Sequence, residues 1–312
     1  MATLTVSKAE ETRVKALGFF SNKGTDNFSG RVITKNGKVS AEVLRNVAEA
    51  AERFGNGEVL VTTRLTFECP GIPFENIEPF MEFLAEKGLE TGGSGKRVRP
   101  VVSCKGTTCQ YGLIDTYDLS EKIHDEFYSK WHDVNLPHKF KIAVGGCPNN
   151  CVKPNLNDLG VIGARVPAIN LDKCKSCKKC AVEAVCPVGA AKLVDGTMVV
   201  DYDKCINCGR CIEKCYFKAM DTQKQGYKVY VGGRWGKQIS HGKLLGKIFT
   251  DEAEVMKTIE KAILFFRENG NFGERFAVTV ERVGFDKVEK ELLSDDILSR
   301  KEEILALSLI HI

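Results

Sequence analysis

Thirteen cysteines are the most informative residues of this 312-residue sequence, because eight of them stand in two short, similar runs. In each run three cysteines are separated by two residues, and a fourth follows a few residues later. Three thiolates at such gaps can converge on three corners of an iron–sulfur cubane, and a fourth completes its ligation. The runs contain Cys174, Cys177, Cys180 and Cys186, and Cys205, Cys208, Cys211 and Cys215.

The fourth cysteine of each run is expected to bind the cluster of the other run, as in two-cluster bacterial ferredoxins. Cys186 would then complete the second triplet, and Cys215 would complete the first. Two details depart from the ferredoxin pattern: five residues rather than three precede Cys186, and Tyr216 rather than proline follows Cys215. Both lie in connecting segments, so we expect them to alter local geometry and not ligation. The pattern predicts two [4Fe–4S] clusters.

Four further cysteines form two separate pairs, and each pair follows a predicted strand. The strands are expected at 98–103 and 139–145. If they are adjacent, one end of a sheet presents four thiolates, which suit a third cubane. Taken alone, this set also fits a structural zinc site. The pairs are Cys104 with Cys109, and Cys147 with Cys151.

Disulfide bonds and zinc are the competing roles for these cysteines. Disulfide-rich secreted proteins are usually small and begin with a signal peptide, whereas residues 1–8 have no apolar core. Zinc ribbons rarely use a third closely spaced cysteine. No stretch reaches the roughly 18 apolar residues of a membrane span. We therefore expect a reducing, cytoplasmic location and no membrane span.

The charge balance is mildly basic, with a net charge of +4 and 45 lysines and arginines. Part of this charge lies beside the cysteines, as at Lys175, Lys178 and Lys179. No repeat of aromatic and basic residues suggests a nucleic acid, so we expect these lysines to meet small anions or an acidic partner. The apolar content of 43% suffices for two or three domains.

Residues 1–92 are expected to form a ferredoxin-like α+β half-domain. Its helices are predicted from their apolar periodicity, and its strands from their Val and Thr content. Cys69 lacks a partner cysteine nearby, and we expect it to be a buried structural thiol. The predicted elements are a strand at 31–34, a helix at 40–55, a strand at 58–67 and a helix at 77–88.

The rest of the chain is expected to form an α/β domain that the cysteine-dense segment interrupts. Residues 93–166 and 225–306 would form the discontinuous host domain, and 167–224 an inserted ferredoxin module. Residues 307–312 match the translation of a sequencing adaptor, and we expect them to be a non-native tail. The predicted elements are strands at 98–103, 139–145 and 227–231, and helices at 118–131 and 251–268.

Five short motifs resemble, in the same order, those of the sirohaem nitrite and sulfite reductase family. The resemblance covers about residues 25–290. The short length and the inserted ferredoxin module make the chain similar to the catalytic chain of anaerobic sulfite reductases. The motifs are Thr62-Thr63-Arg64, Arg99-Pro100-Val101-Val102-Ser103-Cys104, Leu136-Pro137-His138-Lys139-Phe140-Lys141, Gly145-Gly146-Cys147-Pro148-Asn149-Asn150-Cys151 and Gly232-Gly233-Arg234.

The resemblance implies a coupled metal centre at the second cysteine set. Cys104, Cys109, Cys147 and Cys151 would hold a [4Fe–4S] cluster, and the Cys151 thiolate would also bridge to the iron of a sirohaem. The sequence departs from the family here, because four residues separate Cys104 from Cys109 where many relatives have five. The expected cofactors are therefore sirohaem and three [4Fe–4S] clusters.

The resemblance also implies a set of cations around the substrate. Lys139 and Lys141 alternate along the expected strand, so both would reach one pocket while Phe140 packs behind them. Sirohaem carries carboxylates, and further cations are candidates to contact them. The expected sulfite-binding residues are Arg64, Arg99, Lys139 and Lys141. The candidate carboxylate contacts are Arg31, Arg97 and Arg234, with Lys35.

The implied reaction is the six-electron reduction of sulfite to sulfide by an oxidoreductase. No Gly-x-Gly-x-x-Gly follows a strand, so electrons are expected to come from a partner. By resemblance, the partners are an iron–sulfur subunit and an NADH-oxidising flavoprotein, or a ferredoxin. Reduction of nitrite to ammonia at the same centre remains an alternative. Two others are a non-catalytic polyferredoxin that only transfers electrons and a zinc-binding interaction protein.

Overall fold

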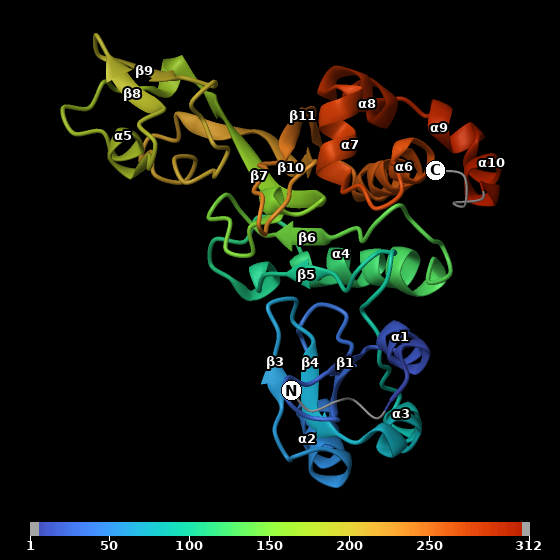
Figure 1. Ribbon diagram of the computed structural model, residues 1–312. Coiled ribbons are helices and arrows are strands. Elements are labelled where there is room, and N and C mark those ends of the chain that lie inside the picture. Colours follow the sequence, from blue (N-terminus) through green and yellow to red (C-terminus); the bar gives the residue numbers. More distant parts are fainter. Residues whose placement is uncertain (1–5, 308–312) are drawn as a thin grey trace.

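The computed structural model describes residues 6–307 and divides into three parts (Figure 1). A lower unit holds the N-terminal helices and strands, a central body follows, and an arm carries the cysteine-dense segment. Of the expected tail at 307–312, residues 308–312 lie outside the described residues. None of the helices within residues 6–307 combines the length and apolar character that crossing a bilayer requires.

The N-terminal unit is a four-stranded antiparallel sheet in the order β1-β2-β4-β3, packed against two amphipathic helices. Ser40 caps the first of these helices by accepting the Val43 N–H at 3.2 Å, and Gly55 follows its last residue. The predicted helices are confirmed. The elements are α1 (Lys8–Ala16), β1 (Phe19–Ser21), β2 (Phe28–Val32), α2 (Ala41–Phe54), β3 (Leu60–Val61), β4 (Phe67–Ile72), η1 (Phe74–Asn76) and α3 (Ile77–Glu86).

The predicted strand at 58–67 is wrong, because a tight reversal divides it into β3 and β4. The Thr62 N–H donates to the Thr66 carbonyl at 2.9 Å, and the two threonine hydroxyls lie 2.7 Å apart. Leu65 has a left-handed φ of 62° at this turn. Val and Thr content favours a strand but does not reveal such a reversal. The turn places Arg64 at the tip of the unit, facing the central body.

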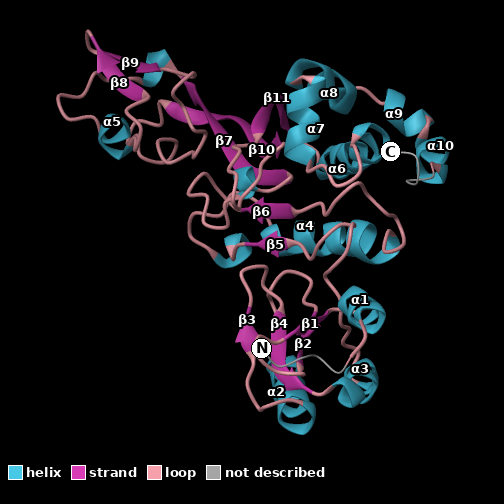
Figure 2. Cartoon of the chain, viewed as in Figure 1, coloured by secondary structure: helices cyan, strands magenta, loops and turns pink. Residues whose placement is uncertain are grey.

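The central body contains a mixed five-stranded sheet in the order β11-β10-β7-β6-β5 (Figure 2). Its strands β5, β6 and β7 run parallel, and β7, β10 and β11 run antiparallel. Parallel strands end at one edge of a sheet, so the loops that follow β5 and β6 lie together. The strands are β5 (Val102–Ser103), β6 (Ile142–Gly145), β7 (Leu159–Ile169), β10 (Met220–Val231) and β11 (Lys243–Phe249).

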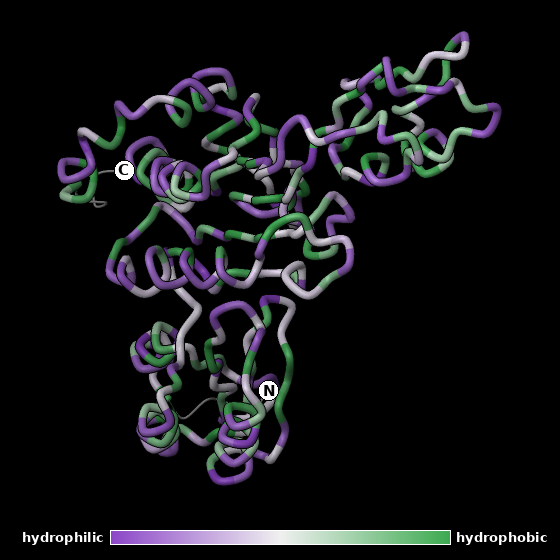
Figure 3. The backbone as a smooth tube through the Cα atoms, turned by 180° about the vertical axis from the view of Figure 1, so that it is seen from behind, coloured by the Kyte–Doolittle hydropathy of each residue, from purple (hydrophilic) through white to green (hydrophobic). Residues whose placement is uncertain are grey.

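Helices pack against this sheet around one large aromatic core (Figure 2). Figure 3 shows hydrophobic stretches along the central strands and more hydrophilic turns at the periphery. Phe140 lies in this core, 5.2 Å from the Phe276 ring and 5.9 Å from the Phe266 ring. The helices are η2 (Gly106–Thr108), α4 (Thr116–Ile123), the π-helix η3 (His124–Lys130), η4 (Pro154–Leu156), α6 (Glu252–Asn269), α7 (Phe276–Val283), α8 (Phe285–Leu293), α9 (Asp296–Ser299) and α10 (Lys301–Ala306).

The arm comprises residues 165–225 and is a continuation of two strands of the central sheet. Strands β7 and β10 pair from Leu159 with Val231 to Ile169 with Met220, so their outer halves form a two-stranded ribbon. A register shift between Thr222 and Lys224 bends this ribbon. The arm has its own small core of buried residues. Its remaining elements are η5 (Leu171–Lys173), α5 (Ala181–Val185), β8 (Ala191–Val194) and β9 (Thr197–Val200).

Candidate active site

The loops after β5 and β6 bring the first two cysteine pairs to one edge of the central sheet. Cys104 directly follows β5, and Cys147 lies two residues beyond β6. The Gly146 N–H donates to the Cys104 sulfur at 3.1 Å. A Cβ on Gly146 would lie 2.8 Å from the Gly106 Cα and 3.6 Å from the Cys104 sulfur. Glycines at both positions therefore allow the two cysteine loops to pack directly against each other.

The four thiols of these loops influence one another. Burial raises the pKa of Cys147, and the nearby sulfurs of Cys104, Cys151 and Cys109 raise it further. Within residues 6–307, no three His, Cys, Asp or Glu side chains are grouped as ligands of a single metal ion. Four soft sulfur donors from two interlocked loops are the ligand set of a [4Fe–4S] cluster, so these residues suit that group.

Residues of both the N-terminal unit and the central body line a cavity beside Cys151. Arg64 enters it from the β3–β4 turn, and Lys141 enters from the segment before β6. The Arg64 guanidinium donates to the Pro100 carbonyl at 2.6 Å and to the Asn157 Oδ1 atom at 3.2 Å. The structure thus brings together Arg64, Lys141 and Cys151, which are far apart in the sequence and were predicted to serve one site.

The two predicted lysines flank a buried aromatic residue. Phe140 is fully buried in the central core, whereas Lys141 lines the cavity beside Cys151 and Lys139 lines a neighbouring one. That neighbouring cavity also contains Arg234, Trp235 and Arg275. The extended backbone therefore directs both lysines away from the core, but they line two cavities rather than the single pocket that their alternation predicts.

Burial and mutual repulsion lower the pKa values of the lysines in this region. Burial lowers the pKa of Lys141 to about 8, and the charges of Arg64, Arg275 and Lys139 contribute, while Asp158 opposes the shift. Burial likewise lowers the pKa of Lys139, with further contributions from Arg275 and Arg99. A lysine with a pKa near neutrality can donate a proton during turnover. An anion bound here would relieve the repulsion.

Asp158 and Arg275 are two central residues that sequence reasoning missed. Asp158 is fully buried, accepts the Lys141 backbone N–H at 2.9 Å, and receives Nη2 of Arg275 at 3.0 Å on both carboxylate oxygens. Burial raises the pKa of Asp158, and Arg275 opposes this shift. No motif or spacing connects residues 117 positions apart. Arg275 could have been suspected only as a cation just before an amphipathic helix.

Arg99 and Arg31 support the junction between the two units. Both guanidinium groups donate to the Gly93 carbonyl. Arg31 also forms an ion pair with Glu68 at 2.6 Å and lies 4.3 Å from the centre of the Phe20 ring. These contacts occupy much of Arg31, which was predicted to contact sirohaem. Burial lowers the pKa of Arg99 to about 10, and the charges of Arg31 and other arginines add to the effect.

Four arginines keep a buried donor available for an acidic group. Within residues 6–307, the buried Nε atoms of Arg97, Arg99, Arg234 and Arg275 donate to no acceptor. Buried guanidinium donors usually have partners, so these atoms suit the oxyanion of a substrate or the carboxylates of a tetrapyrrole. Arg97 also places its Nη1 atom 2.6 Å from Nε2 of His132. Lys35 likewise pairs with Asp125 at 2.8 Å.

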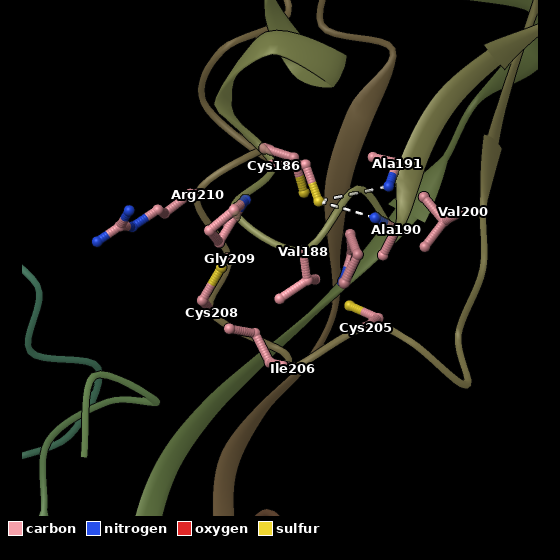
Figure 4. Close-up of a pocket in the computed structure, with 13 residues that line it drawn as sticks. Cys186, Val188, Ala190, Ala191, Val200, Cys205, Ile206, Cys208, Gly209 and Arg210 are labelled. Atoms are coloured by element: carbon pink, nitrogen blue, oxygen red, sulfur yellow. Dashed lines mark hydrogen bonds between the residues drawn. The ribbon is translucent and has the colours of Figure 1, made fainter.

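The arm holds a second sulfur-lined cavity (Figure 4). Four cysteines line it: Cys186, Cys205, Cys208 and Cys211. Burial raises the pKa of Cys211 to about 11, and the nearby sulfurs of the other three raise it further. The structure therefore groups Cys186 with the second triplet rather than with its own run, in the arrangement that the sequence pattern predicts.

The two fourth cysteines of the arm have similar backbone surroundings. The Cys186 sulfur accepts the Ala190 N–H at 3.1 Å and the Ala191 N–H at 3.4 Å (Figure 4). The Cys215 sulfur accepts the Ala219 N–H at 3.3 Å. Burial opposes ionisation of Cys186, but the backbone N–H groups outweigh it and lower the pKa of this thiol. Such donors suit thiolates that ligate a cluster.

Two models of protein families match most of the N-terminal unit and of the central body with its arm. The model described as "Nitrite and sulphite reductase 4Fe-4S domain" matches residues 94–299, and "Nitrite/Sulfite reductase ferredoxin-like half domain" matches residues 21–87. The chain belongs to the nitrite and sulphite reductase family. Arg64 comes from the matched half-domain of this family, and Lys141 and Cys151 come from its 4Fe–4S domain.

Individual members of the nitrite and sulphite reductase family agree with this assignment. The coenzyme F420-dependent sulfite reductase of Methanocaldococcus jannaschii is 35% identical over 82% of this chain, which spans 41% of that relative's length. One subunit of the anaerobic sulfite reductase of Salmonella typhimurium is 32% identical over 68% of this chain and 66% of its own length. The crystal structure of dissimilatory sulfite reductase I has a TM-score of 0.68 at 23% identity, covering 85% of this chain and 69% of its own, which shows a shared fold.

Proposed function

We propose that this protein is the catalytic chain of a sulfite reductase that converts sulfite to sulfide. The balanced reaction is HSO₃⁻ + 6 e⁻ + 6 H⁺ → HS⁻ + 3 H₂O. The observation that carries the proposal is the convergence of Arg64, Lys141 and Cys151 on one cavity. A sirohaem coupled to a [4Fe–4S] cluster would supply electrons to a bound sulfur oxyanion. The free buried arginine donors and the four thiols described above suit both groups.

Each side chain of the cavity has a proposed role. Cys151, with Cys104, Cys109 and Cys147, would hold the cluster, and the Cys151 thiolate would bridge it to the sirohaem iron. Arg64 and Arg99 would hold the oxygens of the substrate by charge-assisted hydrogen bonds. Lys139 and Lys141 would stabilise the same charge and donate protons to the departing oxygens, which their lowered pKa values favour.

Electrons would reach this centre through two further [4Fe–4S] clusters in the arm. One would be held by the cysteines of the cavity in Figure 4, and the other by Cys174, Cys177, Cys180 and Cys215. The donor would be an iron–sulfur subunit with an NADH-oxidising flavoprotein, or a ferredoxin. A reducing compartment such as the cytoplasm would keep all twelve thiols available for iron.

Nitrite is the main alternative substrate, since the matching family includes nitrite reductases. Its reduction to ammonia would use the same centre and the same cations. A non-catalytic electron-transfer role fits the structure less well, because it would not require the cationic cavity beside Cys151. We therefore place sulfite first and nitrite second.

The visible spectrum of anaerobically purified protein tests the proposal. Addition of sulfite to the reduced protein should shift isobacteriochlorin-type absorption bands, and turnover with reduced methyl viologen should release sulfide. Parallel assays with nitrite and detection of ammonia would decide between the two substrates. Broad iron–sulfur absorption that sulfite leaves unchanged, even after reconstitution with sirohaem, would instead identify an electron carrier.

A further inference from the structure

The cavity of the arm that contains Cys208 adjoins the catalytic loops. Arg210 stands between Cys208 and Cys211, and its side chain points away from their cavity (Figure 4). Its Nη2 atom lies 3.4 Å from Oδ1 of Asn149, which stands between Cys147 and Cys151. The guanidinium also lies 4.9 Å from the centre of the Tyr111 ring. A side chain of one cysteine loop thus touches a side chain of the other.

Arg165 fixes this end of the arm to the ribbon that carries it. Its backbone N–H donates to the Asn207 carbonyl at 2.8 Å, and its Nε atom donates to the Thr222 hydroxyl at 2.8 Å. Its Nη1 atom pairs with Glu213 at 3.0 Å. The second triplet is therefore held toward the central body, on the side of the catalytic cysteines.

The first triplet lies at the opposite end. Ser176 stands between Cys174 and Cys177, and a Cβ on Gly196 would lie 3.7 Å from its side chain. Gly196 belongs to the turn of the β8–β9 hairpin, which is at the end of the arm remote from the central body (Figure 1). The Asn170 N–H donates to the Ala219 carbonyl at 2.8 Å, which joins this loop to the segment after Cys215.

Exposed lysines lie beside the cysteines of the first triplet and beside Cys215 in the sequence. We call them the lysine collar. Asp172 is the one acidic residue between positions 171 and 180. Among the ion pairs formed within residues 6–307, none involves a lysine of the collar. The collar consists of Lys173, Lys175, Lys178, Lys179 and Lys218.

Two exposed aromatic residues directly precede Lys218 of the collar. Tyr216 is 90% exposed and Phe217 is 41% exposed, and their rings meet edge to face with centroids 5.3 Å apart. They directly follow Cys215, where a two-cluster ferredoxin would carry proline. Exposed aromatic residues inside a rim of one charge are typical of surfaces that bind other proteins.

We propose that the lysine collar, with Tyr216 and Phe217, binds an acidic iron–sulfur protein that donates single electrons. This inference rests on the proposed function, because it assumes a cluster at the first triplet. In each encounter the donor would lose one electron, and the cluster held by Cys174, Cys177, Cys180 and Cys215 would gain it. No atom is transferred. Electrons would then pass inward by way of the cavity cysteines beside Arg210 to the catalytic centre, and six encounters supply one turnover.

The test uses the full chain with its clusters and a reduced, acidic two-cluster bacterial ferredoxin as the probe. Stopped-flow absorption measures the rate at which the ferredoxin reduces this chain. The wild-type rate should fall as salt is raised, because opposite charges steer association. Lys175→Glu with Lys178→Glu should lower the rate at low salt by about tenfold. Lys23→Glu with Lys287→Glu, two exposed lysines far from the arm, is the matched control and should retain the wild-type rate.

Charge reversal could prevent assembly of the clusters, so a neutral pair, Lys175→Gln with Lys178→Gln, is tested as well. Ferredoxin should reduce this variant more slowly than wild type, by a smaller factor than for the glutamate pair. Cluster content by electron paramagnetic resonance shows that each variant is assembled. A ferredoxin that does not reduce the wild-type chain, or rates that neither salt nor the collar variants change, would overturn the docking proposal. Wild-type protein without clusters, or without viologen-driven sulfite reduction, would instead overturn the proposed function.

Discussion

Asp158 and Arg275 form a buried ion pair directly beneath the cationic cavity. The carboxylate receives Nη2 of Arg275 at 3.0 Å and also accepts the backbone N–H of Lys141 at 2.9 Å. One negative charge therefore joins the C-terminal helices to the segment that presents both lysines. The Asp158 carboxylate partly balances the positive charges of the surrounding lysines and arginines. Without it, these cations would repel one another with no nearby negative charge.

Asp158→Ala should destabilise the protein by about 3–5 kcal/mol, because it leaves Arg275 buried without a partner. Anaerobic urea unfolding would measure the change in the free energy of unfolding. Asp133→Ala removes a carboxylate that is fully exposed, so it serves as the control and should change stability by less than about 0.5 kcal/mol. Equal effects of the two substitutions would remove Asp158 from this structural role.

The pH dependence of turnover should report Lys141. Its pKa is lowered to about 8, so the side chain is protonated below that pH and neutral above it. If Lys141 donates protons, kcat/KM for sulfite should fall as pH rises through about 8. Lys141→Arg keeps the positive charge but donates protons poorly, so its kcat should fall about a hundredfold while KM changes less.

Sulfite ionises in the same way in both assays. The ratio of the wild-type rate to the Lys141→Arg rate at each pH therefore reports the enzyme alone. A wild-type profile that the substitution leaves unchanged in shape and height would exclude Lys141 as the proton donor. Loss of sulfite binding without loss of kcat would assign the residue to anion binding alone.

Cys186→Ser should remove the cluster formed with Cys205, Cys208 and Cys211 and leave the cluster of the first triplet in place. Iron analysis and electron paramagnetic resonance would count the clusters. Cys69→Ala is the control, since Cys69 is buried in the N-terminal unit and burial raises the pKa of its thiol to about 12. Loss of the first triplet's cluster instead would show that each run binds its own cluster.

Gly146→Ala should disrupt the loops that carry Cys104 and Cys147, because the added Cβ would lie 2.8 Å from the Gly106 Cα. Backbone atoms cannot yield as a side chain can, so we expect loss of the cluster at Cys104 and its partners. Gly246→Ala is the control, since its Cβ would meet only the flexible Glu289 carboxylate at 3.3 Å. Full iron content and activity in Gly146→Ala would contradict the close packing of the two loops.

Local spacing predicted the parts of the site that depend on short segments. Two-residue gaps identified the triplets, and alternation around Phe140 placed Lys139 and Lys141 on one side of their segment. The helices at 40–55 and 77–88 followed from apolar periodicity, and the structure confirms them. The ferredoxin-like character of this half-domain came from the family resemblance, and the family model at residues 21–87 confirms it.

Features that depend on contacts between distant segments escaped prediction. The Asp158–Arg275 pair exists only because the segment before α7 packs against the start of β7. The strand expected at 98–103 is confined to Val102–Ser103, and Val98 forms only an isolated bridge with Phe140. The contact of Arg97 with His132 was likewise not predicted. Thr62–Thr66 has the composition of a strand, but its hydroxyl contacts form a turn.

The ribbon of β7 and β10 has a consequence for how the arm is attached. Residues 169 and 220 are direct partners in adjacent antiparallel strands, so the chain leaves and re-enters the host at nearly the same point. A tight turn of two residues could join such strands without disturbing the sheet behind them. We therefore expect that the segment between these residues could be removed while the host fold keeps its register.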